Sequence, residues 1–388
     1  MPNPATRVCV VRSSGVIAPL IMDCYERALR KLGMETHVLD LARAANSATK
    51  LAELLEETAR WQPHLAICYG YSGIRGGGFF RKHNIPLAIL IYDSPFIGAW
   101  QIIGPFLQEI AIYPEAYHCF VWDQVYRKPL MNLGIRNLHP IMLAADPSIF
   151  APRTPSYRFD LAFVGRMGDP HAYRSARQAK CSLRVNAFVD QLLEQRIGSP
   201  AASLIGLWQE LAAKSFPELL FDWTDPDTHG LHRTVHEEGS ARLRGALLGA
   251  IRSVQADVFG SDWSLPGINS HPTVDYGREL PAVYSDSRIN LNITSLQMER
   301  SLNNRIFDVA SVGGFLLTDR GDDLKTIMPD CAPLTYRSAE ELDAKVAHFL
   351  AHESERKELA RELQKAIMKA HTYEHRVIEV FKAITGKG

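Results

Sequence analysis

The sequence predicts an α/β fold of two domains, each built on a parallel β-sheet. Short apolar segments alternate with segments of helical periodicity, and this alternation is typical of parallel strands joined by right-handed helical crossovers. The chain is 388 residues long, which is too long for one ordinary domain and suits two. Pro147, Pro152 and Pro155 make a stiff connection that marks the boundary between the domains.

The composition is that of a globular protein without a strongly charged partner. Lys plus Arg equals Asp plus Glu at 43 residues each, so we do not expect a nucleic acid partner. No apolar stretch is long enough to span a bilayer, and the N-terminus lacks the pattern of a signal peptide. The six cysteines are scattered, which fits a reducing compartment. We therefore expect a cytoplasmic protein without a membrane span.

The predicted N-terminal domain comprises residues 1–150. Its ligand-binding positions are expected at one edge of the sheet, because ligands bind at the carboxyl ends of parallel strands. The expected elements are a helix at 17–32 and strands at 7–11, 36–39, 65–68, 86–91 and 119–122.

Asp93 is a candidate general base of this domain. It follows the strand at 86–91, which places a carboxylate at the ligand edge of the sheet. Alternatively, Asp93 forms a turn or caps a helix before Pro95. A glycine-rich segment, 69–78, also lies at this edge. Its backbone could approach a sugar or phosphate closely, or it could be a surface loop.

The predicted second domain comprises residues 157–370 and begins with a strand at 160–164. A single helix would suffice to join this strand to the next one, at 258–259. Instead, several segments with helical spacing occur at about 175–251, and we predict a helical insertion there. The last segment, 371–388, is expected to form a C-terminal helix.

Two patterns within the insertion are weak matches to metal sites. Asp225-Pro226-Asp227 matches a three-residue Asp-x-Asp metal motif, but its turn-rich context favours a loop. His232 and His236 are four residues apart, a spacing found in metal sites, yet no third ligand is clearly placed. A solvent-exposed helix face explains the two histidines better, and we expect no metal site.

The segment 289–323 is the most informative part of the sequence. An apolar strand is followed by a polar loop, a helix, a Gly-Gly pair and a second strand, an arrangement that forms ligand crevices in α/β domains. Arg305 and Asp308 lie on one face near the start of this helix. An arginine suits a phosphate, and a carboxylate can accept from two ribose hydroxyls. Alternatively, the two residues form an exposed pair at the helix start.

This segment resembles CgeB-like proteins, which are spore-maturation-type glycosyltransferases of the GT-B fold. The hinge of that family is similar to the segment 145–152. The resemblance implies two Rossmann-like domains facing a cleft, with the helical insertion in the second domain. It also implies that the C-terminal helix at 371–388 crosses back to the first domain. The similar runs are Arg305-Ile306-Phe307-Asp308, Gly313-Gly314 and Leu316-Leu317-Thr318-Asp319.

The resemblance further implies roles for individual residues. Arg305 and Arg166 would contact the diphosphate of a nucleotide-sugar donor, and Asp308 would hold its ribose. Asp93 would be the base in an inverting reaction, so catalysis is expected to depend on Asp93 and Arg305. The other donor-binding candidates are Tyr276 and Gly277, at the nucleotide base, together with Asn303 and Asn304.

The sequence departs from the family pattern at two positions. The wider GT-B family carries Glu where Asp308 stands, and retaining enzymes often carry an earlier Glu where this chain has Arg300. Retention of configuration is therefore not implied. Two candidate residues also have simpler explanations: Arg166 could be a solvated arginine in a tight turn, and Tyr276 could be a core residue.

The expected function is transfer of a sugar from a nucleotide-sugar donor to a glycan, protein or small-molecule acceptor. No metal or other cofactor is expected, because arginines can stabilise the leaving diphosphate. Two alternatives remain open. One is an NDP-sugar epimerase or hydrolase on the same fold. The other is a non-catalytic nucleotide- or glycan-binding module, which Asp308 and Arg300 favour.

Overall fold

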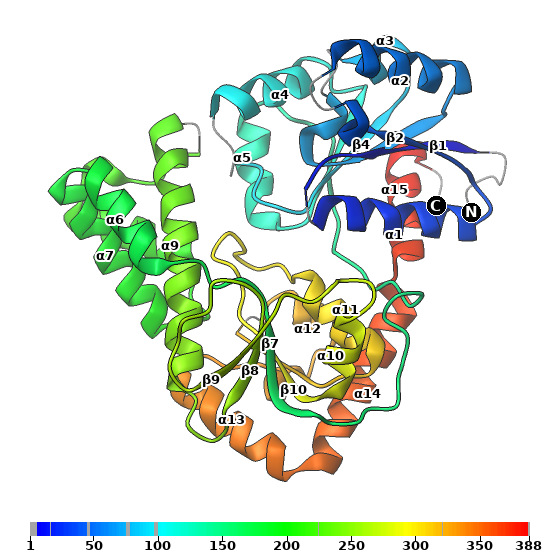
Figure 1. Cartoon of the computed structure of the whole chain (residues 1–388). Coiled ribbons are helices and arrows are strands. Elements are labelled where there is room, and N and C mark those ends of the chain that lie inside the picture. Colours follow the sequence, from blue (N-terminus) through cyan, green and yellow to red (C-terminus); the bar gives the residue numbers. More distant parts are fainter. Residues whose placement is uncertain are drawn as a thin grey trace. The chain divides into compact units, whose positions relative to one another are not determined.

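The chain is organised in two compact units, each with its own parallel β-sheet and packed helices (Figure 1). The units are Met1–Leu143 with Thr372–Gly388, and Ala144–His371. The predicted α/β class with two Rossmann-like domains is confirmed. The computed structural model describes residues 6–15, 17–44, 47–74, 78–96, 100–223, 225–319 and 321–386.

Within its described residues, the first unit has a six-stranded sheet with strand order β2-β1-β3-β4-β5-β6. Neighbouring strands are parallel throughout. The strand β4 is buried at every residue, as expected for a central parallel strand covered on both faces. The strands are β1 (Arg7–Arg12), β2 (Glu35–Asp40), β3 (Leu65–Tyr69), β4 (Leu87–Ile91), β5 (Tyr117–Val121) and β6 (Leu138–Pro140).

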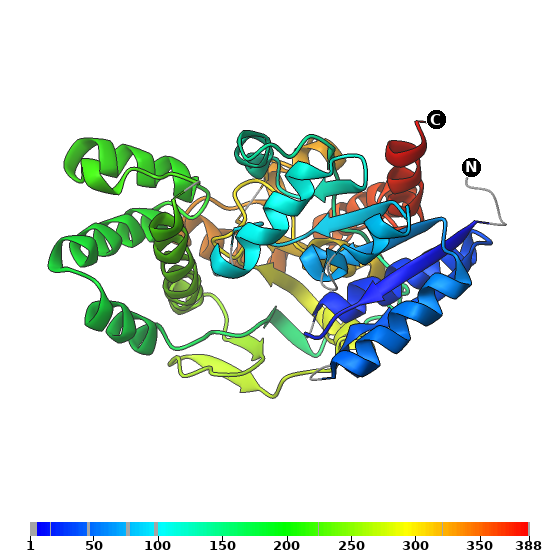
Figure 2. The same ribbon diagram turned by 90° about the horizontal axis from the view of Figure 1, so that it is seen from above.

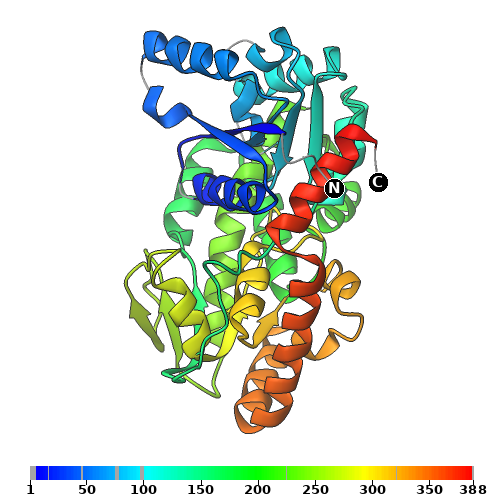
Figure 3. The ribbon, with the colours of Figure 1, turned by 90° about the vertical axis from the view of Figure 1, so that its right-hand side faces the viewer.

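The end of the chain completes the first unit. The helix α15 (Tyr373–Thr385) lies beside α1 (Ile17–Lys31), as Figure 3 shows. The rings of Tyr25 and Tyr373 meet edge to face with their centroids 5.2 Å apart. The other helices of this unit are α2 (Ala48–Trp61), α3 (Phe79–Lys82), α4 (Trp100–Ile112) and α5 (Arg127–Asn132), with short 3₁₀ turns η1 (Leu41–Ala44), η2 (Gly70–Ile74) and η3 (Gln124–Tyr126).

The second unit has a five-stranded parallel sheet, in its described residues, with strand order β11-β10-β7-β8-β9. The first strand, β7, lies between β8 and β10, so the chain leaves β7 on one side and returns on the other. Such a reversal creates a crevice at the carboxyl ends of the two strands beside it, here β7 and β10. The strands are β7 (Phe159–Val164), β8 (Ala256–Phe259), β9 (Ile268–His271), β10 (Ser287–Asn292) and β11 (Leu316–Thr318).

The helix α11 (Asn304–Val312) begins at this crevice and carries the predicted arginine and aspartate. It ends at Gly313, whose φ of 82° lies in the left-handed region that glycine adopts without strain. The other helices after β9 are α10 (Leu280–Asp286), α12 (Leu324–Ile327), α13 (Ala339–Ala351) and α14 (Glu353–Ala370), with a 3₁₀ turn η5 (Ala332–Leu334).

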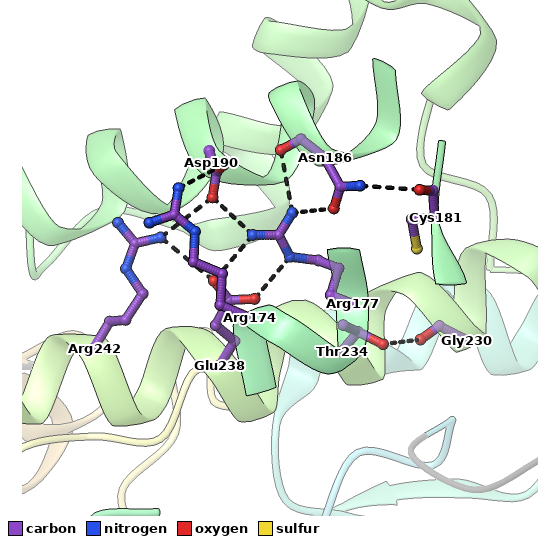
Figure 4. A network of polar contacts seen from close by, with 9 residues as sticks. All are labelled: Arg174, Arg177, Cys181, Asn186, Asp190, Gly230, Thr234, Glu238 and Arg242. Carbon is purple, nitrogen blue, oxygen red and sulfur yellow. Dashed lines mark hydrogen bonds and ion pairs between the residues drawn. The ribbon is translucent and has the colours of Figure 1, made fainter. Parts of the chain in front are cut away.

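The predicted insertion is helical and separates β7 from β8. Figure 2 shows its helices, in green, gathered in one cluster. Arg177 is fully buried in this cluster and pairs with Glu238 and with Asp190, each at 2.7 Å (Figure 4). These contacts join three helices of the insertion, since each residue comes from a different one. The helices are α6 (Pro170–Lys180), α7 (Leu183–Gly198), α8 (Leu204–Ser215) and α9 (Pro226–Ala250), with a 3₁₀ turn η4 (Pro217–Leu219).

Two predictions for the insertion need correction. The predicted loop 225–227 is wrong from Pro226 on, because α9 begins there: Asp225 caps the helix, and its carboxylate accepts from the backbone N–H of Asp227 and of Thr228. The solvent-exposed face expected for the histidines is also wrong. His232 is 1% exposed and packs among the aromatic rings of the insertion. In the part of the chain that the structure describes, no group of three or more His, Cys, Asp or Glu side chains could hold a metal ion.

No helix among the described residues is both long enough and apolar enough to cross a membrane.

Candidate functional site

Asn292 organises the crevice of the second unit. It is the last residue of β10 and is buried. Its side-chain oxygen accepts from the guanidinium of Arg305 and, at 2.7 Å, from the amide of Asn303. Its amide nitrogen donates to the hydroxyl of Thr318 at 3.0 Å. The end of β10 therefore fixes the residues that begin α11.

Arg305 lies in the first turn of α11 with its guanidinium facing β7. Besides Asn292, it donates to the backbone carbonyl of Val164, and it lies 5.0 Å from the centre of the Phe163 ring. Its Nε is buried and has no acceptor among the described residues. No carboxylate in the described part of the chain forms an ion pair with Arg305 at close range. A half-buried guanidinium whose Nε has no acceptor can bind an anion.

Asp308 is buried rather than exposed, so the alternative of an exposed Arg–Asp pair is wrong. The residue is 1% exposed. Its Oδ2 accepts from the hydroxyl of Tyr276 at 2.8 Å and from the amide of Asn304 at 3.1 Å. Burial raises the pKa of Asp308 to about 8, although these two hydrogen bonds and the charge of Arg305 oppose the rise. The carboxyl group therefore changes charge near neutral pH.

Tyr276 is half-buried, and its predicted place at the nucleotide base stays a prediction. Its ring packs edge to face on Phe150 with centroids 5.1 Å apart. Its hydroxyl reaches Asp308, so its polar end belongs to the site. The turn around it is held by Asp275, whose side chain accepts from the backbone N–H of Gly277 and of Arg278. Tyr276 and Gly277 thus lie on a turn that leads to Asp308.

Arg166 takes a different position from Arg305. Its side chain is exposed and pairs with Asp262 at 2.7 Å, while its backbone follows the end of β7. It lines a cavity of about 1130 Å³ whose wall also includes Trp263 and helices α6 and α9. The indole of Trp263 donates to the carbonyl of Gly165 at 2.8 Å. The side chains of the two predicted diphosphate arginines thus have different partners.

Asp93 lines a cavity of about 320 Å³ in the first unit, at the carboxyl ends of β1, β3 and β4. The hydroxyl of Tyr69 donates to its Oδ2 at 2.5 Å. Tyr71 and Phe106 stack with centroids 5.9 Å apart and form an apolar part of the wall. The remaining lining residues are Ser13, Ser14, Gly70, Ser72, Ile91, Tyr92, Ser94, Pro95, Ile102 and Ile103.

The glycine-rich segment 69–78 is described only in part. Gly70 begins η2 and has a φ of 53°, and it lines the same cavity as Asp93. Gly76 and Gly77 lie outside the described residues. The described half of the segment is therefore a wall of the cavity rather than an open loop.

Comparison with known proteins places this geometry in a recognised fold. Residues 241–382 match a family described as "Glycosyl transferase-like". The structure of Anabaena Alr3699/HepE in complex with UDP-glucose is similar, with a TM-score of 0.56 and 9% identity, over 97% of this chain and 99% of that one. T4 phage BGT in complex with UDP-glucose has a TM-score of 0.53 and 9% identity, over 98% and 99% of the two chains. The chain has the GT-B fold.

The matched segment extends from α9 to α15 and includes Tyr276, Arg305 and Asp308, but neither Asp93 nor Arg166. No curated protein sequence matches the chain. The narrower resemblance to CgeB-like proteins therefore stays a prediction.

Three residues of the crevice were missed in the sequence. Asn292 was noted only as part of a strand, although a polar side chain at the end of an apolar strand is itself a signal of a ligand edge. Asp319 follows β11, and its carboxylate accepts from the backbone N–H and the hydroxyl of Thr294. Arg244 lies in the insertion, its Nη1 donates to the backbone carbonyl of Arg166 after the end of β7, and no motif pointed to it.

Proposed function

We propose that this protein is a glycosyltransferase that uses a UDP-sugar as its donor. The observation that carries the proposal is Arg305, a guanidinium held at the crevice of the second sheet without a paired carboxylate among the described residues. It lies in the segment that matches the glycosyl transferase-like family. UDP is the proposed nucleotide because HepE and T4 phage BGT, which share the fold, were solved in complex with UDP or UDP-glucose.

The second unit is proposed to bind the donor. Arg305 would contact the diphosphate, since a guanidinium can bridge two phosphate oxygens. Asp308 would hold the ribose. The hydroxyl of Tyr276 already donates to Oδ2 of this carboxyl group, so the group is placed to accept from hydroxyl donors. Asn303 supports the role of Arg305 indirectly, because it bonds to Asn292, whereas Asn304 donates directly to the carboxyl group of Asp308.

The cavity of the first unit is proposed to bind the acceptor. Its volume of about 320 Å³ suits a group of the size of one sugar ring or a small aromatic molecule. Asp93 would take the proton from the acceptor hydroxyl, whose oxygen then attacks the anomeric carbon of the donor. The bond between this carbon and the β-phosphate oxygen breaks, and UDP leaves with the bonding electrons. The configuration at the anomeric carbon is inverted.

The proposed reaction needs no metal ion. Arg305 supplies positive charge where charge develops on the leaving diphosphate, which is what the metal does in metal-dependent transferases. The contact should strengthen in the transition state, because the diphosphate gains negative charge as the sugar leaves.

The experiment is a turnover assay with a panel of UDP-sugars. UDP release is measured with and without candidate glycan and small-molecule acceptors, in the presence of excess EDTA. We expect release that depends on an acceptor and is unchanged by EDTA. Full-rate release without any acceptor would indicate a hydrolase or epimerase instead, and UDP binding without turnover would indicate a non-catalytic module. Failure to bind any nucleotide would contradict the proposal itself.

A further inference from the structure

The long helix α9 presents one face to the crevice described above. His236, Ser240 and Arg244 are four residues apart and therefore lie on one line along this helix. The first two contact the loop after β10: His236 Nε2 lies 3.2 Å from the hydroxyl of Ser295, and Ser240 accepts from the backbone N–H of Leu296 at 3.0 Å. This part of the insertion is thus attached to the loop that leads into α11.

Arg244 extends the same face to the end of β7. Its Nη1 donates to the backbone carbonyl of Arg166 at 2.6 Å. Arg305 donates to the carbonyl of Val164, two residues earlier in the same turn. A Cβ on Gly165, between them, would lie 3.5 Å from the guanidinium of Arg305. Two guanidinium groups from different helices therefore converge on the backbone turn 164–166.

Contacts on the opposite side of α9 fix the orientation of the face that carries Arg244. Glu238 accepts from Arg177 of α6 at 2.7 Å, and Arg242, one turn further along α9, lies 3.5 Å from Glu238 and 3.7 Å from Asp190 of α7 (Figure 4). The pair formed by Arg177 and Glu238 is completely buried. Rotation of α9 would break this network, so Arg244 is held toward β7.

Neither guanidinium group forms an ion pair among the described residues, and the Nε of each is buried without an acceptor. The carboxylate of Asp319, which Thr294 holds in place, attracts Arg244 and offsets part of its charge without a direct contact. Burial and the charge of Arg305 lower the pKa of Arg244 to about 10, which leaves it protonated at neutral pH.

His236, on the same face of α9 as Arg244, adds no charge to the site. Burial, together with the charges of Arg244 and Arg233, lowers the pKa of His236 to about 4, so it is neutral at physiological pH. The turn 164–166 is therefore faced by two guanidinium groups, and Asp319 offsets only part of the positive charge of Arg244. The remaining repulsion between the two guanidinium groups would be relieved by a ligand with two negative groups.

We infer that Arg244 is a second diphosphate-binding residue, supplied by the insertion, and that Arg244 and Arg305 together select a diphosphate over a monophosphate. This inference rests on the proposed function for the identity of the nucleotide. The anion site itself does not depend on the proposed function, because two guanidinium groups without ion pairs would also bind inorganic pyrophosphate. The insertion then has a function of its own, since its buried ion network positions a side chain that completes the donor site.

The test is calorimetric binding of UDP, UMP, uridine and inorganic pyrophosphate to the wild type and to Arg244→Gln. Glutamine keeps a hydrogen-bond donor but removes the charge. We expect the variant to lose about tenfold or more in affinity for UDP and for pyrophosphate, as for a lost charge-assisted hydrogen bond. Uridine affinity should not change. The matched control is Arg233→Gln, on the same helix, because Arg233 is exposed and pairs with Glu237 at the surface.

The outcomes separate the two proposals. Equal losses for UDP and uridine would mean that Arg244 only supports the fold, and unchanged UDP and pyrophosphate affinity would also overturn the inference. If the wild type binds pyrophosphate through Arg244 but no nucleotide, the anion site stands and the proposed function fails. Thermal unfolding without ligand is a further check: loss of the repulsion should leave the Tm of Arg244→Gln no lower than that of Arg233→Gln, whereas a clearly lower Tm would assign Arg244 a structural role.

Discussion

The ligand edges of the two sheets carry polar side chains of different kinds. In the first unit, hydroxyl groups and the half-buried carboxylate of Asp93 line a cavity of about 320 Å³. In the second unit, Asp308 is 1% exposed and bonds to Tyr276 and Asn304, while the half-buried guanidinium of Arg305 bonds to the side-chain oxygen of Asn292. The first edge suits a neutral ligand that gives up a proton. The second edge suits an anionic ligand.

The difference shows how one architecture can divide the work of a reaction. A buried charge costs stability unless a partner compensates it, and under the proposed function a charged donor would supply part of this compensation at the second edge. Half-buried groups such as Asp93 keep access to solvent and can exchange protons with an acceptor hydroxyl. Substitutions at the two edges should therefore affect different steps of the proposed reaction.

The largest expected effect is on turnover, from Asp93→Asn. Loss of a general base should lower kcat by about 10²- to 10⁴-fold. UDP affinity should be unchanged, because the donor is assigned to the other unit. The control is Asp40→Asn: Asp40 ends β2 in the same sheet, and its carboxylate accepts from the backbone N–H of Ala42. A fall in UDP affinity as large as the fall in kcat would break the proposed division between the two edges.

The next effect in size is expected from Arg305→Lys. Lysine keeps the charge but loses the fork that bridges two phosphate oxygens. The variant should lose about 2–4 kcal/mol of transition-state stabilisation, and it should lower kcat more than it raises the donor KM. Arg288→Lys is the matched control, since Arg288 lies in β10 and pairs with Asp160. Near-normal turnover of Arg305→Lys would show that the arginine only packs against β7.

An effect on stability rather than on turnover is expected from the titration of Asp308. An unfolded aspartate has a pKa of about 3.9, whereas burial raises that of Asp308 to about 8. Between these values the folded protein holds the proton and the unfolded chain does not. The stability that Asp308 contributes should therefore fall as the pH rises from about 4 to about 8, by at most about 1.4 kcal/mol per pH unit.

Asp308→Asn should remove this pH dependence, as measured by urea unfolding at several pH values. The control is Asp262→Asn, because Arg166 holds the pKa of Asp262 below its usual range and this group stays ionised above about pH 4. Asp308→Asn should also weaken UDP binding by about tenfold or more at pH 8, since a charge-assisted bond to the ribose is lost. A parallel pH profile for the wild type and Asp308→Asn would contradict the assignment of the buried carboxyl.

The sequence sufficed for those parts of the fold that depend on local pattern. The apolar run of β4 and the strand, loop and helix around Arg305 follow from periodicity and turn residues, and both occur where they were predicted. Burial was harder to predict. The spacing of Arg305 and Asp308 fits an exposed pair as well as a site, and only the packing of Tyr276 on Phe150 places a hydroxyl on the carboxyl group.

Long-range contacts account for the other differences. His232 follows the polar spacing of a surface helix, yet Trp208, Phe221 and Trp223 of the same insertion enclose it. Arg244 carries no motif, because its place depends on how α9 packs against the loop after β10, many residues away in sequence. Contacts of this kind depend on tertiary packing, which neither hydrophobic periodicity nor motif spacing encodes.

The most direct test of the proposed donor site is a crystal structure of the protein with bound UDP. We predict that the ribose hydroxyls lie within about 3 Å of the carboxyl oxygens of Asp308, and that a β-phosphate oxygen lies equally close to the guanidinium of Arg305. UDP bound elsewhere would contradict this assignment. So would UDP in this crevice with the Arg305 guanidinium still turned to Asn292 and Val164 and its phosphates out of reach.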